Sequence, residues 1–83
     1  MTKAQETIIL KMVRDDFECG HSYDPFDEDL LARDLLSEGD ADTEETANEM
    51  AKFYFECHSE GPCGFYQSHP KIGWSDDFKA MYA

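Results

Sequence analysis

Two short stretches of this chain repeat a pattern of cysteine and histidine, the side chains best suited to binding a metal. Residues 17–22 read Phe-Glu-Cys-Gly-His-Ser, and residues 55–59 read Phe-Glu-Cys-His-Ser. Thiolates and imidazoles are the usual ligands of tetrahedral zinc, and a bound metal would stabilise a small acidic fold because its binding energy adds to the folding energy. The repeat therefore makes four residues candidate zinc ligands: Cys19, His21, Cys57 and His58.

The spacing of these residues also fits a second interpretation, in which no cofactor is bound. The chain has no C-x₂-C pair and no H-x₃₋₅-H pair, and the further candidates Cys63 and His69 do not supply one. Free cysteine often acts as a small buried apolar side chain, and a buried imidazole can be hydrogen-bonded within the protein. In this interpretation Cys57 and His58 pack beneath residues 62–74.

Catalysis has less support from the sequence. A Cys–His pair or two carboxylates could perform nucleophilic or acid–base chemistry. The chain has no nucleophile elbow, phosphate-binding loop or HExxH motif. The acidic run at 40–45 lacks the glycine and the twelve-residue spacing of an EF-hand, and a helix cap followed by an acidic first turn explains it better. We therefore expect a protein that is not an enzyme.

The acidic charge is concentrated in one segment. Residues 15–60 carry sixteen carboxylates but only two basic side chains, Arg33 and Lys52, and the whole chain has a net charge of −12. Repulsion among so many like charges opposes folding, so a partner outside the chain explains them better than internal stability does. Solubility alone is the simpler explanation. The size of the charge and its continuity over two predicted helices favour a binding role.

Capping residues and apolar periodicity indicate where helices should position these groups. Thr2 and Gln5 have the spacing of a capping box at the start of the first helix, and Gly20 is suited to end it. Asp24 and Pro25 are a typical N-cap and first position for the second helix. We predict three helices, near residues 3–19, 25–38 and 43–60.

The third predicted helix has two candidate N-caps, Asp42 and Thr43, and Glu45 lies at capping-box spacing from Asp42. Each predicted helix has one apolar face. The side chains expected in the core are Ile9, Met12, Val13, Phe17, Leu31, Leu35, Ala47, Met50, Ala51 and Tyr54.

The C-terminal part of the sequence reads differently. Glycine and proline recur every few residues in 61–74, which predicts irregular chain, with a short strand as an option for 65–68. Its aromatic side chains are expected to fold back over the helices, and Ser75 is suited to cap a final short helix. The fold expected for residues 1–83 is a single, mainly α, acidic domain: a small three-helix bundle with an irregular aromatic C-terminal segment and a short last helix.

The composition also bears on location. No apolar run approaches the 18 residues of a membrane-spanning helix, and no signal-peptide pattern occurs. Three cysteines are an odd number, which argues against a closed disulfide framework and fits a reducing compartment. We therefore expect a cytoplasmic protein, in the host cytoplasm if its source is a virus.

In charge and size, although in no motif, the chain resembles phage-encoded inhibitors of host defence nucleases and CRISPR complexes, and DNA mimics generally. The resemblance implies a non-enzymatic inhibitor that fills the basic DNA or RNA channel of a nucleic-acid-binding protein, with no direct binding of nucleic acid or membrane. Carboxylates one helical turn apart lie about 6 Å from each other, a spacing comparable with phosphates along a strand. The partner-binding residues expected on the predicted helices are Asp27, Asp34, Glu38, Asp40, Asp42, Glu45 and Glu49.

A structural or adaptor protein is the alternative function. Such a protein would bind its partner through an aromatic surface, with acidity serving only solubility and zinc as an optional stabiliser. A homodimer is compatible with either function. The aromatic residues expected on that surface are Phe53, Phe55, Phe65 and Trp74.

Overall fold

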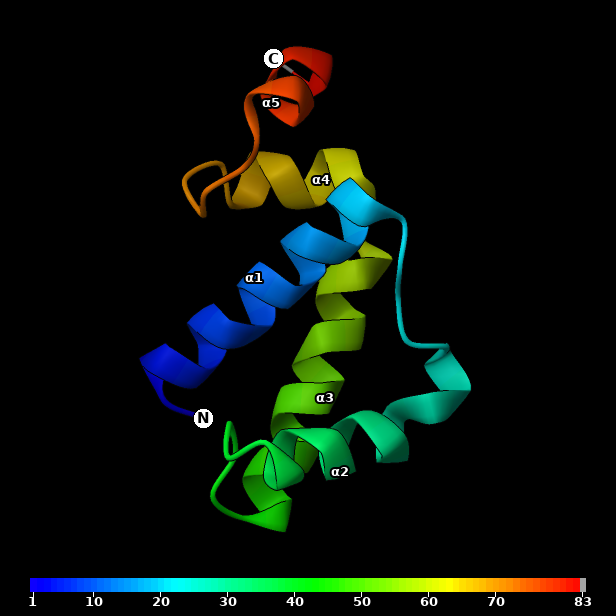
Figure 1. Cartoon of the computed structure of the whole chain (residues 1–83), viewed down its shortest axis with the longest axis vertical. Helices are drawn as coiled ribbons and strands as arrows, with labels where there is room; N and C mark the ends of the chain where they lie inside the picture. Colours follow the sequence, from blue (N-terminus) through cyan, green and yellow to red (C-terminus); the bar gives the residue numbers. More distant parts are fainter. Residues whose placement is uncertain (83) are drawn as a thin grey trace.

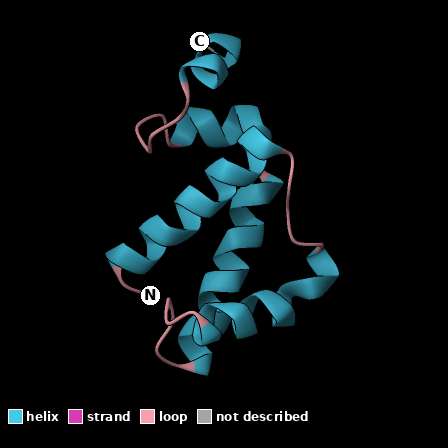
Figure 2. Ribbon diagram, in the orientation of Figure 1, coloured by secondary structure: helices cyan, strands magenta, loops and turns pink. Residues whose placement is uncertain are grey.

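The computed structural model describes residues 1–82, and all of the regular structure in that range is helical (Figures 1 and 2). This confirms the predicted mainly α bundle. None of the helices in the described range is long and apolar enough to cross a bilayer. The elements in chain order are α1 (Lys3–Cys19), the short 3₁₀ helix η1 (Pro25–Asp27), α2 (Glu28–Ser37), α3 (Glu44–Ser59), α4 (Gly61–Ser68) and α5 (Asp76–Tyr82).

Helix α3 is the centre of the arrangement. Helix α1 crosses it obliquely, α2 packs across its N-terminal half, and α4 crosses its C-terminal end, with α5 stacked beyond α4 (Figure 1). Its buried residues therefore come from several sides of the helix, and they include Ala47, Met50, Ala51 and Tyr54. The apolar side chains of α3 therefore cover more of its circumference than a single narrow face would.

The helix ends follow local capping chemistry. Thr2 and Gln5 form the predicted capping box, and Gly20 ends α1 with a φ of 77°. The Asp24 carboxylate caps η1 rather than an α-helical turn, so the predicted second helix begins as a 3₁₀ turn. Thr43 caps α3, and the Asp42 carboxylate instead accepts a hydrogen bond from the Gln5 amide of α1.

The core contains most of the predicted side chains. Eight of the ten are buried, whereas Met12 and Phe17 are half-buried and pack against its edge. Further buried residues come from α1, α2 and α3, from the connection after α2 and from the C-terminal region. These additional core residues are Leu10, Ala32, Ala41, Cys57, Phe65, Trp74 and Phe78.

The prediction of irregular chain from 61 to 74 is wrong for its first eight residues, which form α4, and the optional strand at 65–68 lies within that helix. Gly61 has a φ of 76° and changes the direction of the chain after α3. Pro62 then lies in the first turn of α4, where its missing N–H needs no helical partner. The glycine and proline therefore separate two helices instead of preventing the second.

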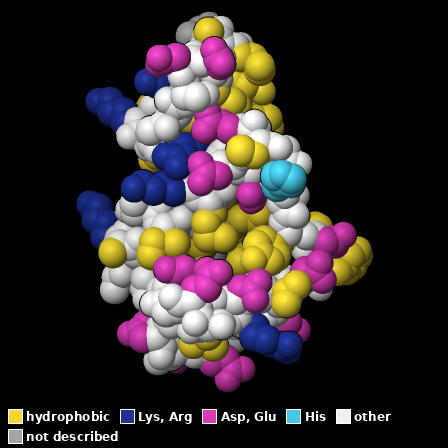
Figure 3. All heavy atoms as spheres, in the orientation of Figure 1, with side chains coloured by type: hydrophobic (Ala, Val, Ile, Leu, Met, Phe, Trp, Pro, Cys, Tyr) yellow, Lys and Arg dark blue, Asp and Glu magenta, His cyan; other side chains and the backbone are white. Residues whose placement is uncertain are grey.

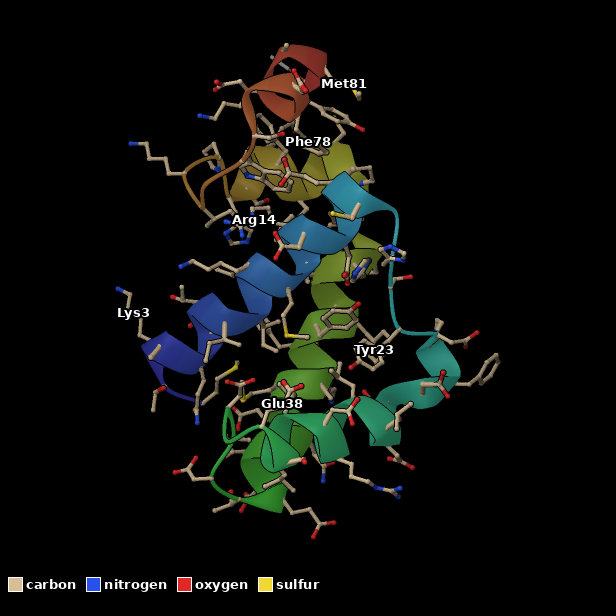
Figure 4. The ribbon with its side chains drawn as sticks, viewed as in Figure 1. Lys3, Arg14, Tyr23, Glu38, Phe78 and Met81 are labelled. Atoms are coloured by element: carbon tan, nitrogen blue, oxygen red, sulfur yellow. The ribbon has the colours of Figure 1, made fainter. Side chains whose placement is uncertain are left out.

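The remaining irregular segment is held against α1. The Arg14 guanidinium donates to the carbonyl of Ile72, and the Glu18 carboxylate accepts from the N–H of Ser75 at 2.8 Å (Figure 4). Trp74 stacks on Phe78 with ring centroids 4.4 Å apart. The C-terminal residues thereby extend the core past α4, and α1 is the element that fixes their position.

Candidate functional site

The four candidate zinc ligands do not form one cluster. Cys19 and His21 are exposed, whereas Cys57 is buried. Within residues 1–82 no group of three or more His, Cys, Asp or Glu side chains is arranged to hold a metal ion. Burial, together with Glu60, raises the pKa of the Cys57 thiol to about 12. Because nucleophilic attack needs the thiolate, this environment does not favour Cys57 as a nucleophile.

His58 belongs to a different cluster, centred on Asp16. The Asp16 carboxylate accepts a hydrogen bond from the Tyr54 hydroxyl and lies 3.0 Å from the His58 Nε2. The Tyr54 hydroxyl in turn accepts from the Tyr23 N–H at 3.1 Å. An aspartate within the apolar face of α1 is explained by this network, which joins α1 to α3 and to the segment before η1.

Tyr23 extends the network to α2. Its hydroxyl donates to the Asp34 carboxylate at 2.9 Å, and its ring meets that of Tyr54 edge to face at 5.8 Å. Tyr23 lies between α3 and the start of α2 (Figure 4). Desolvation, followed by the hydrogen bond to Asp34, raises the pKa of Tyr23 to about 12. Desolvation and the bond to Asp16 likewise raise the pKa of Tyr54.

Removing the Tyr54 hydroxyl should destabilise the domain. In Tyr54→Phe, the Asp16 carboxylate and the Tyr23 N–H each lose a partner in a region shielded from water, so we expect a loss of about 1–3 kcal/mol in urea unfolding. The matched control is Tyr66→Phe, because within residues 1–82 the Tyr66 hydroxyl makes no hydrogen bond. An equal change in the two variants would contradict the proposed importance of the network.

Alkaline pH should also destabilise the protein, because the folded state holds the side chains of Tyr23, Tyr54 and Cys57 in their protonated form. At pH 7 the side chains of Tyr23, Tyr54 and Cys57 are neutral in both the folded and the unfolded state. Their folded pKa values are raised, so at higher pH the unfolded chain loses protons first and unfolding is favoured. The melting temperature should therefore fall as pH rises from 9 towards 12, and the fall should be shallower in Tyr23→Phe. Circular dichroism melts with a flat profile between pH 9 and 11 would contradict this.

The predicted partner-binding carboxylates lie from the end of η1 along α2, over the following connection and the start of α3. Figure 3 shows a row of acidic side chains along the edge of α2 that faces α1, and Figure 4 places Glu38 at the C-terminal end of that helix. Five of the seven predicted residues are exposed, whereas Asp34 and Asp40 are half-buried. The acidic surface therefore forms as a band over two helices.

Within the band, three of the seven carboxylates have partners in the fold. Asp34 accepts from Tyr23, Asp42 accepts from the Gln5 amide at 3.0 Å, and Glu49 pairs with the N-terminal amine at 2.9 Å. Asp34 is half-buried and its carboxylate holds the Tyr23 hydroxyl, so its role in binding a partner stays a prediction. In the described part of the chain, the carboxylates of the other four residues make no ion pair or hydrogen bond: Asp27, Glu38, Asp40 and Glu45.

An open hollow adds carboxylates that the sequence analysis did not place on this surface. It has a volume of about 380 Å³, and Asp16, Asp24 and Asp27 line it together with His21 and Tyr23. The sequence predicts Asp24 only as a helix cap, and it assigns no role to Asp16. No pattern in the sequence predicts that Asp16 and Asp24 line one hollow, because this depends on the path that the chain takes between α1 and η1.

Basic side chains gather away from this band. In Figure 3 most of the visible Lys and Arg atoms lie along α1 and the end of the molecule that carries α4 and α5. Arg33 and Lys52, the basic residues within 15–60, are both exposed and form no ion pair with any described residue. Apart from the N-terminal amine at Glu49, no cation within residues 1–82 forms an ion pair with the acidic band.

The aromatic surface expected of an adaptor does not form. Phe65 is completely buried and Trp74 is 3% exposed, while Phe53 and Phe55 are half-buried against the core. These rings stabilise the domain instead of presenting a common binding face. The specific surface on which the adaptor interpretation depended is thus absent from the described fold.

Comparison with known proteins identified no relative of this chain. No family model matches the sequence, and no match was found among curated proteins or solved structures. The acidic band and the hollow beside it are therefore the features from which function can be argued.

Proposed function

We propose that this protein is a non-enzymatic inhibitor that binds a nucleic-acid-binding protein and covers its DNA- or RNA-binding groove. One observation carries the proposal: a continuous band of carboxylates over α2 and the start of α3, of which four have no partner in the described fold. Lysine and arginine side chains that otherwise hold phosphates would pair with them. The partner is defined by its chemistry, as a protein with a basic groove.

The geometry of the band is compatible with replacing a phosphate backbone. Asp34 on α2 and Glu38 at the C-cap of α2 lie one helical turn apart, which places such side chains about 5–6 Å from each other. The connection to α3 is tied to α1 through the Gln5 amide, which donates to Asp42 and to the Asp40 carbonyl. A band whose backbone is already ordered loses little conformational entropy on binding.

The open hollow supports the same proposal. Asp16, Asp24 and Asp27 line a space of about 380 Å³, which is enough for the end of a lysine or arginine side chain. The hollow continues the charge of the band towards the start of α2. Electrostatic steering by such a field speeds association with a basic surface and repels free nucleic acid. The proposed place of action is the cytoplasm, where such a partner works. If the source is a virus, this is the host cytoplasm.

Salt dependence and competition test this function. The immobilised protein is exposed to the heparin-binding proteins of the cells in which it acts, and retained proteins are identified by mass spectrometry. With a purified partner, we expect affinity to fall at least about tenfold between about 50 and 200 mM salt, because paired charges are screened. We also expect duplex DNA or RNA to compete for the same site. A complex that is insensitive to salt and still admits nucleic acid would rule out the proposed mimicry.

A further inference from the structure

One large apolar side chain is left entirely outside the core. Phe26 is 96% exposed, and Leu30, one turn further along, is 45% exposed. All the other phenylalanines of the chain are buried or half-buried. Figure 3 shows hydrophobic atoms among carboxylates at the right-hand edge of the molecule, where Figure 1 places η1. Phe26 and Leu30 are called the apolar tip below, and the Phe26 ring makes almost no contact within the fold.

The turn that carries the tip is well ordered by its own contacts. The Asp24 carboxylate accepts from the Phe26 N–H at 2.9 Å, and the Asp24 carbonyl accepts from the Asp27 N–H at 2.8 Å. Pro25 restricts the backbone between them. Tyr23, directly before the turn, is held at both ends by Tyr54 and Asp34. The ring of Phe26 is thus presented from a fixed backbone, which lowers the entropic cost of burying it in a partner.

The charges around the tip select among partners. Four exposed carboxylates flank it in sequence, and no lysine or arginine lies between Arg14 and Arg33. A second copy would bring like charges together, and an anionic membrane or a nucleic acid would be repelled. A protein surface with an apolar pocket and a rim of lysine or arginine is complementary to both features. The flanking carboxylates are those of Asp24, Asp27, Glu28 and Asp29.

We infer that the apolar tip is the hydrophobic anchor of the interface: Phe26 enters an apolar pocket on the protein partner, and lysine or arginine side chains at its rim meet the flanking carboxylates. The inference rests on the proposed function, because pairing of the acidic band with the partner's basic groove orients the apolar tip towards its pocket. Large aromatic side chains that fill a desolvated pocket commonly dominate binding energy, whereas charges at the rim mainly set specificity and association rate.

Site-specific photo-crosslinking tests the inference separately from the proposed function. The photoreactive residue p-benzoylphenylalanine replaces Phe26, Glu38 or Lys79 in three otherwise identical proteins, which are illuminated with the heparin-binding proteins of the cells in which the protein acts. Position 38 reports on the acidic band, position 26 on the tip, and position 79 on the opposite end of the molecule. We expect positions 26 and 38 to capture the same identified protein, and position 26 to attach beside basic residues of its nucleic-acid groove.

Crosslinking at position 38 without position 26 would overturn the inference and leave the proposed function standing. Crosslinking at neither position would overturn both, and crosslinking of position 26 to a second copy would make the tip a homodimer contact. With the purified partner, Phe26→Ala should weaken binding at least about tenfold, whereas Met81→Ala, which removes an apolar side chain that is 71% exposed on α5, should not. Equal affinities for the two variants would overturn the anchor. Unchanged melting temperatures would show that both variants fold.

Discussion

The triple variant Asp27→Lys, Glu38→Lys, Glu45→Lys is expected to lose at least about 100-fold in affinity for the partner, because each reversal replaces an attraction by a repulsion across the interface. The three carboxylates are exposed and make no hydrogen bond or ion pair with any described residue. The variant should therefore fold normally. Asp34 is left unchanged because its carboxylate holds the Tyr23 hydroxyl.

A second triple variant tests whether affinity depends on where the charges are reversed or only on the net charge. Glu6→Lys, Glu56→Lys, Glu60→Lys changes the net charge from −12 to −6, as the first variant does, but these three residues lie around a different hollow beside Cys57. We expect this control to keep affinity within about fivefold, the residual loss arising from weaker long-range steering. Isothermal titration calorimetry at a fixed salt concentration measures the affinity of each triple variant for the partner. An equal loss in both variants would show that only net charge matters and would contradict a defined binding face.

The substitution Trp74→Ala is expected to destabilise the domain by about 3–5 kcal/mol, a large part of the stability of so small a protein. The ring is 3% exposed, stacks on Phe78 and meets Phe65 edge to face at 5.8 Å. Its indole N–H also donates to the carbonyl of His69 at 2.7 Å. The variant should lose the packing of α5 and weaken that of α4 against the bundle.

Urea unfolding followed by circular dichroism measures this loss, since the variant has no tryptophan to report by fluorescence. The matched control is again Met81→Ala, whose side chain lies on α5 but points away from Phe78 and α4 (Figure 4). It should change stability by less than about 0.5 kcal/mol. A small effect of Trp74→Ala would mean that the C-terminal residues pack only loosely and do not belong to the core.

Local chemistry made much of the fold predictable from the sequence. Helix starts depend on side chains within a few residues of each other, so Thr2 with Gln5 and Asp24 with Pro25 could be identified without tertiary information. The apolar faces of the first three predicted helices depend on a period of 3.6 residues and gave eight of ten core residues. Gly61 and Pro62 were harder to interpret, because the same pair can stop a helix or separate two helices.

Part of the candidate site could also be recognised from the sequence, because net charge is a property of composition. The location of an acidic band on the second and third predicted helices follows from their spacing. Its division into four free and three engaged carboxylates does not, because the partners of Asp34, Asp42 and Glu49 come from residues 11 to 48 positions away in sequence. Long-range pairing depends on how helices cross, and spacing along one helix carries no information about that crossing.

The sequence by itself determined the helical class, most helix ends, and the excess of acid between residues 15 and 60. Only the tertiary structure decided which aromatic rings are interior: Phe65 and Trp74 are buried by α1, α4 and α5, whereas Phe26 remains in solvent. It also decided that Asp16 joins Tyr54 and His58. Hydrophobicity and charge are properties of each residue, but burial and pairing depend on which other elements occupy the neighbouring space.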